Sequence, residues 1–103
     1  MKNGAFRAYL TTTGRNTGRK HSVWLRAVVY DEKIYFSRRN ENSDWLKNAL
    51  AYPAVKIELD GQTYTGNALL VTDDSLAKKI SQLKYPGEVR AEEVRIVLQV
   101  NLN

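Results

Sequence analysis

The chain has 103 residues, enough for one domain, and its 43% hydrophobic and 26% charged residues are ordinary proportions for a globular protein. It has no cysteine and one histidine, which excludes disulfides, a thiol nucleophile and thiolate or multi-imidazole metal sites. The formal net charge of +5 favours an anionic partner, such as nucleic acid, a phosphorylated cofactor or an acidic membrane surface.

The first part of the chain predicts three antiparallel strands. Residues 6–13 are rich in aromatic and β-branched side chains and end at a glycine, which is typical of a first strand. Residues 21–30 follow as its hairpin partner. A turn at 31–33 leads to a third strand at 34–37, which ends just before a pair of arginines.

The next segment predicts a helix of about two to three turns. Asn42 or Ser43 can cap it, and Asp44 suits the positive end of the helix dipole. The helix should stop before Pro53, because the residue before a proline avoids helical angles. Trp45 and the leucine and alanine residues that follow it occur at helical spacing. We therefore expect Trp45 to pack in the core rather than stack on a ligand.

The rest of the chain predicts a hairpin, a second helix and a last strand. Residues 55–59 alternate apolar and polar side chains, an Asp-Gly pair typical of tight hairpins follows, and 62–71 return as the partner strand. The second helix begins at Asp73 or Asp74 and ends before a Pro-Gly pair. After a charged loop, apolar residues alternate along 94–102, as in a half-buried strand.

This order of elements predicts a mainly β fold: a barrel of about six antiparallel strands with two short helices. A doubly wound sheet would instead need a helix between successive parallel strands. No apolar run approaches the roughly 20 residues of a membrane span, and the N-terminus has no signal-peptide core, so we expect a cytoplasmic protein of one domain, residues 1–103. Because so small a domain buries limited surface, we expect a homodimer.

The most informative segment is the run of residues 11–19, Thr-Thr-Thr-Gly-Arg-Asn-Thr-Gly-Arg, between the first two strands. Glycines let backbone N–H groups approach an oxyanion, threonine hydroxyls can donate to its oxygens, and arginines can pair with it through two hydrogen bonds. Two interpretations stay open on spacing alone. The segment is either a phosphate-binding loop or a polar hairpin tip whose glycines serve only the turn.

Several modest motifs occur in one order along the chain. They are the segment 10–19, the strand 21–25, the pair Ser37-Arg38, the helix 44–55, the hairpin 58–64 and Tyr85-Pro86-Gly87. In this combination the chain resembles the split β-barrel flavin and deazaflavin oxidoreductases. It is most similar to their deazaflavin-dependent nitroreductase or quinone reductase branch, which is related to the pyridoxamine-phosphate-oxidase-like FMN barrels.

The resemblance implies a split barrel that binds coenzyme F-420, a deazaflavin with a phosphorylated and polyglutamylated tail, or FMN as in related branches. It also implies hydride transfer from the reduced cofactor to a small organic acceptor of the quinone or nitro type. The implied cofactor-binding residues are Arg15, Thr17, Gly18, Arg19 and His21 near the tail phosphate, with Ser37 and Arg38 along the groove. No catalytic side chain and no metal ligand follow from it.

The chain departs from the family pattern at three places. Arg39-Asn40 stand where the family has two glycines, so we expect side chains there to narrow the pocket. Trp24 replaces a proline, and Glu-Val-Arg at 88–90 replaces an aromatic cluster. The last difference argues against tyrosine-assisted protonation of a nitro or quinone substrate.

Two other functions are compatible with the sequence. Basic residues interleaved with aromatic ones can form a stacking and electrostatic groove for nucleic acid. The aromatic residues concerned are Tyr9, Trp24, Tyr30, Tyr35 and Phe36. A family member that binds the cofactor without turning it over is the other alternative. Before the resemblance is considered, His21 is expected to be only a polar surface residue.

Overall fold

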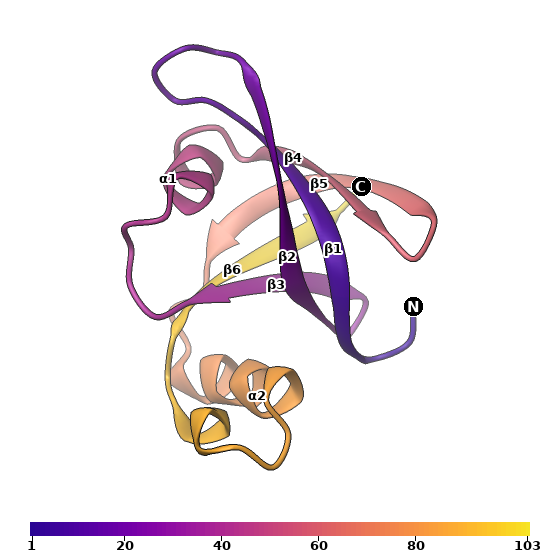
Figure 1. Ribbon diagram of the computed structural model, residues 1–103, viewed down its shortest axis with the longest axis vertical. Helices are drawn as coiled ribbons and strands as arrows, with labels where there is room; N and C mark the ends of the chain where they lie inside the picture. Colours follow the sequence, from indigo (N-terminus) through magenta and orange to yellow (C-terminus); the bar gives the residue numbers. More distant parts are fainter.

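The computed structural model describes residues 1–103 and closes six antiparallel strands into a barrel (Figure 1). The strands are β1 (Gly4–Thr13), β2 (Lys20–Tyr30), β3 (Lys33–Arg38), β4 (Ala54–Leu59), β5 (Gln62–Leu70) and β6 (Ile96–Leu102). They pair in the order β1-β2-β3-β6-β5-β4, and β4 pairs back with β1. The predicted mainly β barrel is therefore confirmed.

Three helical segments occupy the connections between strands. They are α1 (Asp44–Ala51), α2 (Asp74–Lys84) and the short 3-10 helix η1 (Val89–Glu92). The tip of the β1–β2 hairpin projects beyond the barrel on the same side as α1, whereas α2 and η1 lie at the opposite end (Figure 1). No helix is both long and apolar enough to cross a membrane.

Two tight turns set the register of neighbouring strands. Asp31 and Glu32, between β2 and β3, have φ values of 51° and 60°, and Asp60 and Gly61, between β4 and β5, have 51° and 75°. Positive φ at both central residues matches the twist of the flanking strands, as in type I′ hairpins. The hairpin predicted from the Asp-Gly pair is therefore confirmed.

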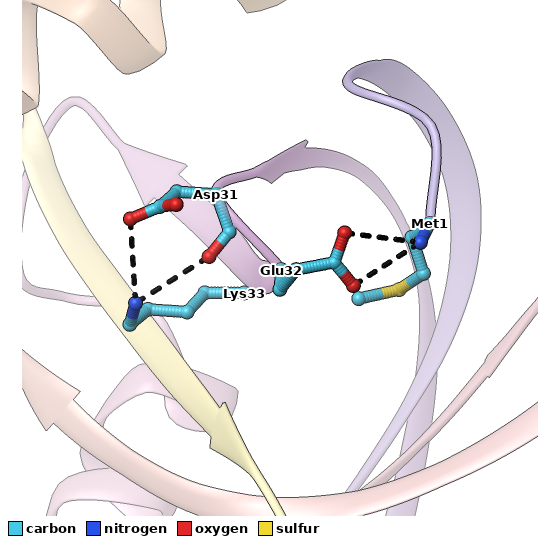
Figure 2. Close-up of polar contacts among 4 residues, drawn as sticks. All are labelled: Met1, Asp31, Glu32 and Lys33. Atoms are coloured by element: carbon cyan, nitrogen blue, oxygen red, sulfur yellow. Dashed lines mark hydrogen bonds and ion pairs between the residues drawn. The ribbon is translucent and has the colours of Figure 1, made fainter.

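The start of the chain lies against the β2–β3 turn (Figure 2). The amino nitrogen of Met1 is 3.3 and 3.2 Å from the two carboxylate oxygens of Glu32. Beside it, Nζ of Lys33 donates to the main-chain oxygen of Asp31 at 3.4 Å and lies 3.7 Å from its carboxylate. Exposed ion pairs contribute about 0–1 kcal/mol each, so these contacts place the chain start without stabilising the fold much.

Alternation along the strands gives the barrel an inner and an outer core. Successive side chains of a strand point to opposite faces, so Ile34 and Phe36 enter the barrel while Tyr35 between them points outward. Leu46 and Ala49 of α1 belong to the inner core. The outer core lies under α2 and consists of Val28, Tyr35, Ala77, Ile80 and Val97.

The last strand begins later than the sequence predicts. The alternation predicted a strand over 94–102, but β6 begins at Ile96, opposite Arg38. Arg38 is the last residue of β3, so residues before Ile96 have no strand to pair with, and Val94 is 54% exposed. The predicted charged loop contains η1. The other predicted boundaries lie within one or two residues of the observed ones.

Gly66 of β5 lies against the backbone of β6. A Cβ at this position would overlap the main-chain oxygen of Asn101 and lie 2.8 Å from Cγ1 of Val100. We expect Gly66→Ala to lower the free energy of unfolding by about 1–3 kcal/mol, because the β5–β6 ladder must shift to make room. Urea unfolding measures this, with Thr63→Ala at an exposed position of β5 as control. Equal losses in the two variants would contradict the expectation.

Candidate cofactor-binding cleft

The β1–β2 hairpin tip and the beginning of α1 enclose a cleft of about 550 Å³. This volume lies within the usual range of small-molecule sites. Most of its lining residues are polar. They are Thr12, Gly14, Arg15, Asn16, Thr17, His21, Ser22, Val23, Leu25, Arg38, Ser43, Asp44, Trp45 and Asn48.

Backbone hydrogen bonds give the hairpin tip a defined shape. The N–H of Gly14 donates to the oxygen of Arg19 at 2.7 Å, and the N–H of Gly18 donates to the oxygen of Gly14 at 2.8 Å. Gly18 has a φ of 72°, which glycine adopts without strain. A Cβ on Gly14 would lie 2.7 Å from Oγ1 of Thr17 and 2.8 Å from Nε2 of His21. Glycine at position 14 therefore lets these two polar side chains approach the loop backbone.

Arg15 is held against α1 by the side chain of Asn48. The amide oxygen of Asn48, a residue only 5% exposed, accepts from the backbone nitrogen of Arg15 at 3.1 Å and from its Nη1 at 2.7 Å. Nη2 of Arg15 lies 3.4 Å from the carboxylate of Asp44. These contacts restrain the guanidinium at the wall of the cleft, where it can pair with an anion.

Two buried hydroxyl groups at the cleft have no hydrogen-bond partner. One is Oγ1 of Thr12, a residue 1% exposed, and the other is Oγ of Ser43. Ser43 occupies the N-cap position of α1, but its side chain makes no capping hydrogen bond, whereas Asp73 caps α2 through the N–H groups of Ser75 and Leu76. An unsatisfied buried polar group costs about 1–3 kcal/mol. The pair of hydroxyls therefore points to a polar ligand in this cleft.

The structure brings four of the predicted site residues together. These four, Arg15, Thr17, His21 and Arg38, line the cleft. Gly18 and Arg19 belong to the same hairpin tip but are exposed outside the cleft wall. Ser37 does not line this cleft: it is buried, its Oγ accepts a hydrogen bond from Lys84 at 3.1 Å, and it lines a second, smaller cleft beside this one.

The cleft also contains a residue that sequence reasoning missed, Asn48. Asn48 follows Trp45 by three positions, so it lies on the apolar face of the predicted helix. A polar side chain on the apolar face of a helix could have indicated that Asn48 contacts a polar group. Thr12 belongs to the run 11–19 that the sequence marks as a candidate phosphate-binding loop, but it was not among the residues implied to bind the cofactor.

A smaller cleft of about 360 Å³ adjoins the first one, and both are lined by Leu25, Arg38 and Trp45. Trp45 is half-buried, and its ring meets that of Phe36 edge-on at a centroid distance of 6.0 Å. The structure thus gives Trp45 the predicted packing role and also a place in the wall between the two clefts.

Basic side chains surround Tyr85 at this smaller cleft. Nζ of Lys84 lies 5.3 Å from the Tyr85 ring centroid, and the guanidinium carbons of Arg90 and Arg95 lie 4.0 and 5.2 Å from it. Burial raises the pKa of Tyr85, but the charges of Lys84 and Arg95 outweigh burial and bring this pKa below its usual value of 10.0. Burial lowers the pKa of Lys84, with Tyr85 opposing it.

We expect the earliest tyrosine ionisation of the folded protein to belong to Tyr85. Its folded pKa lies below the unfolded value, so its contribution to stability is complete above pH 10 and is lost as pH falls through the folded pKa. Tyr85→Phe should remove the first step in tyrosinate absorbance during a pH titration. Lys84→Met should move that step to higher pH, because a neighbouring positive charge is gone. A first step that persists in Tyr85→Phe would contradict this assignment.

The aromatic residues proposed for nucleic-acid stacking do not form one surface. Tyr35 and Phe36 are buried in different cores, at 3% and 1% exposure. Tyr9 and Trp24 pack together at a centroid distance of 4.7 Å, and the guanidinium of Arg7 lies 4.7 Å from the Trp24 ring. This arrangement does not support a groove on which successive bases stack.

Comparison with known proteins gives a family match over nearly the whole chain. Residues 2–102 match the family model for F420H(2)-dependent quinone reductase. None of the curated proteins matches the chain.

Solved structures share the fold at low sequence identity. An F420-H2 dependent reductase (FDR-A) is 20% identical with a TM-score of 0.71, and the alignment covers 92% of this chain and 93% of that one. A protein described as a domain-swapped dimer is 20% identical with a TM-score of 0.73, covering 92% and 79% of the two chains. A putative pyridoxamine 5'-phosphate oxidase from Listeria innocua is 15% identical with a TM-score of 0.72, covering 94% and 83%.

Proposed function

Because the chain belongs to the family of F-420-dependent quinone reductases, as its motifs indicated, we propose that it reduces a small organic acceptor of the quinone or nitro type. Reduced coenzyme F-420 is the cofactor of this family and, when bound, supplies the hydride. The observation that carries the proposal is the cleft at the hairpin tip, which is lined by the restrained guanidinium of Arg15 and by two residues with unpartnered hydroxyls.

The residues of this cleft fit a phosphorylated ring cofactor. Arg15, Thr17 and His21 would bind the tail phosphate, because a guanidinium, a hydroxyl and an imidazole can all donate to its oxygens. The hydroxyls of Thr12 and Ser43 would gain in the ligand the partners that they lack in the protein. FMN carries a phosphate as well and is the alternative cofactor.

The chain's own contribution would be position and electrostatics. Val23, Leu25 and Trp45 provide the apolar part of the cleft wall, which would cover a ring system and exclude water from it. Arg38 lies at the junction of the two clefts, where its positive charge would stabilise negative charge on the ring or on the acceptor.

Titration of the purified protein with reduced F-420, oxidised F-420 and FMN tests the proposal, with tryptophan fluorescence as the readout. Trp45 lines both clefts and Trp24 lines the smaller one, so we expect saturable quenching by F-420 and weaker binding of FMN. If F-420 causes no saturable response in fluorescence or calorimetry, the proposal is wrong.

Thr12→Val makes this test specific to the cleft, because valine keeps the shape of threonine and removes only the hydroxyl. We expect about 5- to 12-fold weaker binding of F-420, which corresponds to about 1–1.5 kcal/mol. The protein without cofactor should become more stable, since a buried unsatisfied group is gone. Thr63→Val, at an exposed position of β5, is the control. Unchanged affinity in Thr12→Val would show that the ligand does not use this hydroxyl.

We also propose that the protein is a homodimer. Large apolar side chains are exposed on the single chain, among them Trp24 at 53%, Leu69 at 41% and Leu70 at 42%. A second copy would cover such surface, and one protein of the same fold is described as a domain-swapped dimer. Light scattering should therefore give about twice the chain mass of 11.8 kDa.

A further inference from the structure

The smaller cleft contains an excess of positive charge. Its ionised lining residues are all cations, namely Arg26, Arg38, Lys84 and Arg90, and no aspartate or glutamate lines it. The remaining walls include the aromatic rings of Trp24, Phe36, Trp45 and Tyr85. A cleft with aromatic walls and several cations is suited to a planar anion.

Most of this charge has no carboxylate partner. Lys84 is 8% exposed, and its ammonium group donates to the main-chain oxygen and to Oγ of Ser37, both at 3.1 Å and both uncharged. Arg95 donates to the hydroxyl of Tyr85, while its Nε is buried without a partner. Arg90 alone among these cations pairs with an acid, Glu88. Of the lining cations only Lys84 is buried; a buried cation is normally paired, so an anionic ligand would supply the countercharge that Lys84 lacks.

The position of this cleft relates it to the proposed reaction. It shares Leu25, Arg38 and Trp45 with the cofactor cleft, so a molecule bound in it lies next to one bound at the hairpin tip. Two of its lining residues, Trp24 and Arg90, stand where the chain departs from the family pattern. Arg90 therefore adds a positive charge to this cleft at a place where the chain departs from the family pattern.

Building on the proposed function, we propose that the smaller cleft is the acceptor site and that it selects an anionic aromatic acceptor, such as a quinone that carries a carboxylate or sulfonate. Lys84, Arg26 and Arg90 bind the anionic group, and the aromatic walls hold the ring. The ring of Tyr85 lies among these cations, and its hydroxyl accepts a hydrogen bond from Arg95. A neutral quinone of the same size loses the ionic contacts and binds more weakly.

Calorimetric titration of the cofactor-free protein with a naphthoquinone sulfonate and with menadione, a neutral naphthoquinone of similar size, tests this proposal. We expect the sulfonate to bind at least about tenfold more tightly at low salt, with a preference that falls as salt is added. Equal affinity for the two quinones, or no binding of the sulfonate, would overturn it.

Lys84→Met and Arg90→Gln should each reduce the preference for the sulfonate about three- to tenfold and leave menadione unaffected. Arg90 is exposed, so its variant remains informative if the buried Lys84 variant does not fold. Lys47→Met removes the same charge from an exposed position of α1 outside both clefts and serves as the control.

The same variants separate this proposal from the proposed function. If Lys84→Met and Arg90→Gln weaken the binding of F-420 but not of the sulfonate, the cations serve the carboxylates of the cofactor tail, and the acceptor proposal is wrong. If the sulfonate binds with the expected preference while F-420 does not bind to the wild type, the anion site stands and the proposed function fails.

Discussion

Replacing Arg15 by methionine is expected to weaken the binding of reduced coenzyme F-420 by about 10- to 150-fold. Methionine keeps much of the length of the side chain and loses its charge and donors. A hydrogen bond to a charged group contributes about 1.5–3 kcal/mol, which corresponds to this range of dissociation constants. Calorimetry at two salt concentrations measures the loss, and the variant should also show a weaker salt dependence.

Arg19→Met is the matched control for this prediction. Both arginines belong to the hairpin tip, but Arg15 lines the cleft and is held by Asn48, whereas Arg19 is exposed outside the cleft wall. We expect Arg19→Met to change the affinity less than about threefold, as for a solvent-screened charge. Equal losses in the two variants would mean that the loop binds the anion as a diffuse basic patch.

A loss of affinity in Arg15→Met should not arise from unfolding. Asn48 would lose the contact with Nη1 of Arg15 but keep the contact with the backbone N–H of residue 15. We therefore expect the free energy of unfolding to fall by only about 1 kcal/mol. Thermal unfolding of the variant without cofactor checks this.

The barrel could be predicted from the sequence because its signals are local. Val55, Ile57 and Leu59 alternate with polar residues, and the structure buries these three and exposes their neighbours. Closure between β1 and β4, and the pairing of β3 with β6, depend on contacts between segments far apart in the chain. Hairpin rules do not reach such contacts, so the strand order could not be derived.

Part of the site could also be predicted from the sequence because its signals are local. Arg15, Thr17 and His21 fall within one short hairpin tip, so a sequence motif could mark them. Asn48 joins them only because α1 packs beside that tip. The sequence of the helix alone does not predict this packing. Ser37 was predicted for the wrong cleft although it lies next to a cleft residue. Side chains of a strand alternate between its two sides, so Phe36 and Arg38 share one side of β3 and Ser37 lies on the other, against Lys84.

The largest effect on stability is expected from Phe36→Ala. Phe36 is 1% exposed in the barrel core, and a phenylalanine truncated at such a position costs about 3–5 kcal/mol. Small domains have total stabilities of about 5–15 kcal/mol, so the variant should be close to unfolding at ordinary temperature. Urea unfolding followed by tryptophan fluorescence measures the loss, and Thr63→Ala, at an exposed position of β5, is the control. Its free energy of unfolding should change by less than about 0.5 kcal/mol.

Phe36→Leu keeps the protein folded and connects this core position to the cleft. Leucine fills part of the volume, so we expect an intermediate loss of stability. The Phe36 ring packs edge-on with the ring of Trp45, which lines both clefts, so removing the Phe36 ring should let the Trp45 side chain move. The affinity for F-420 should then fall several-fold although residue 36 is not part of the cofactor cleft. If Phe36→Leu loses stability but binds F-420 as tightly as the wild type, Trp45 is positioned by α1 alone and the packing of the barrel core does not determine the shape of the site.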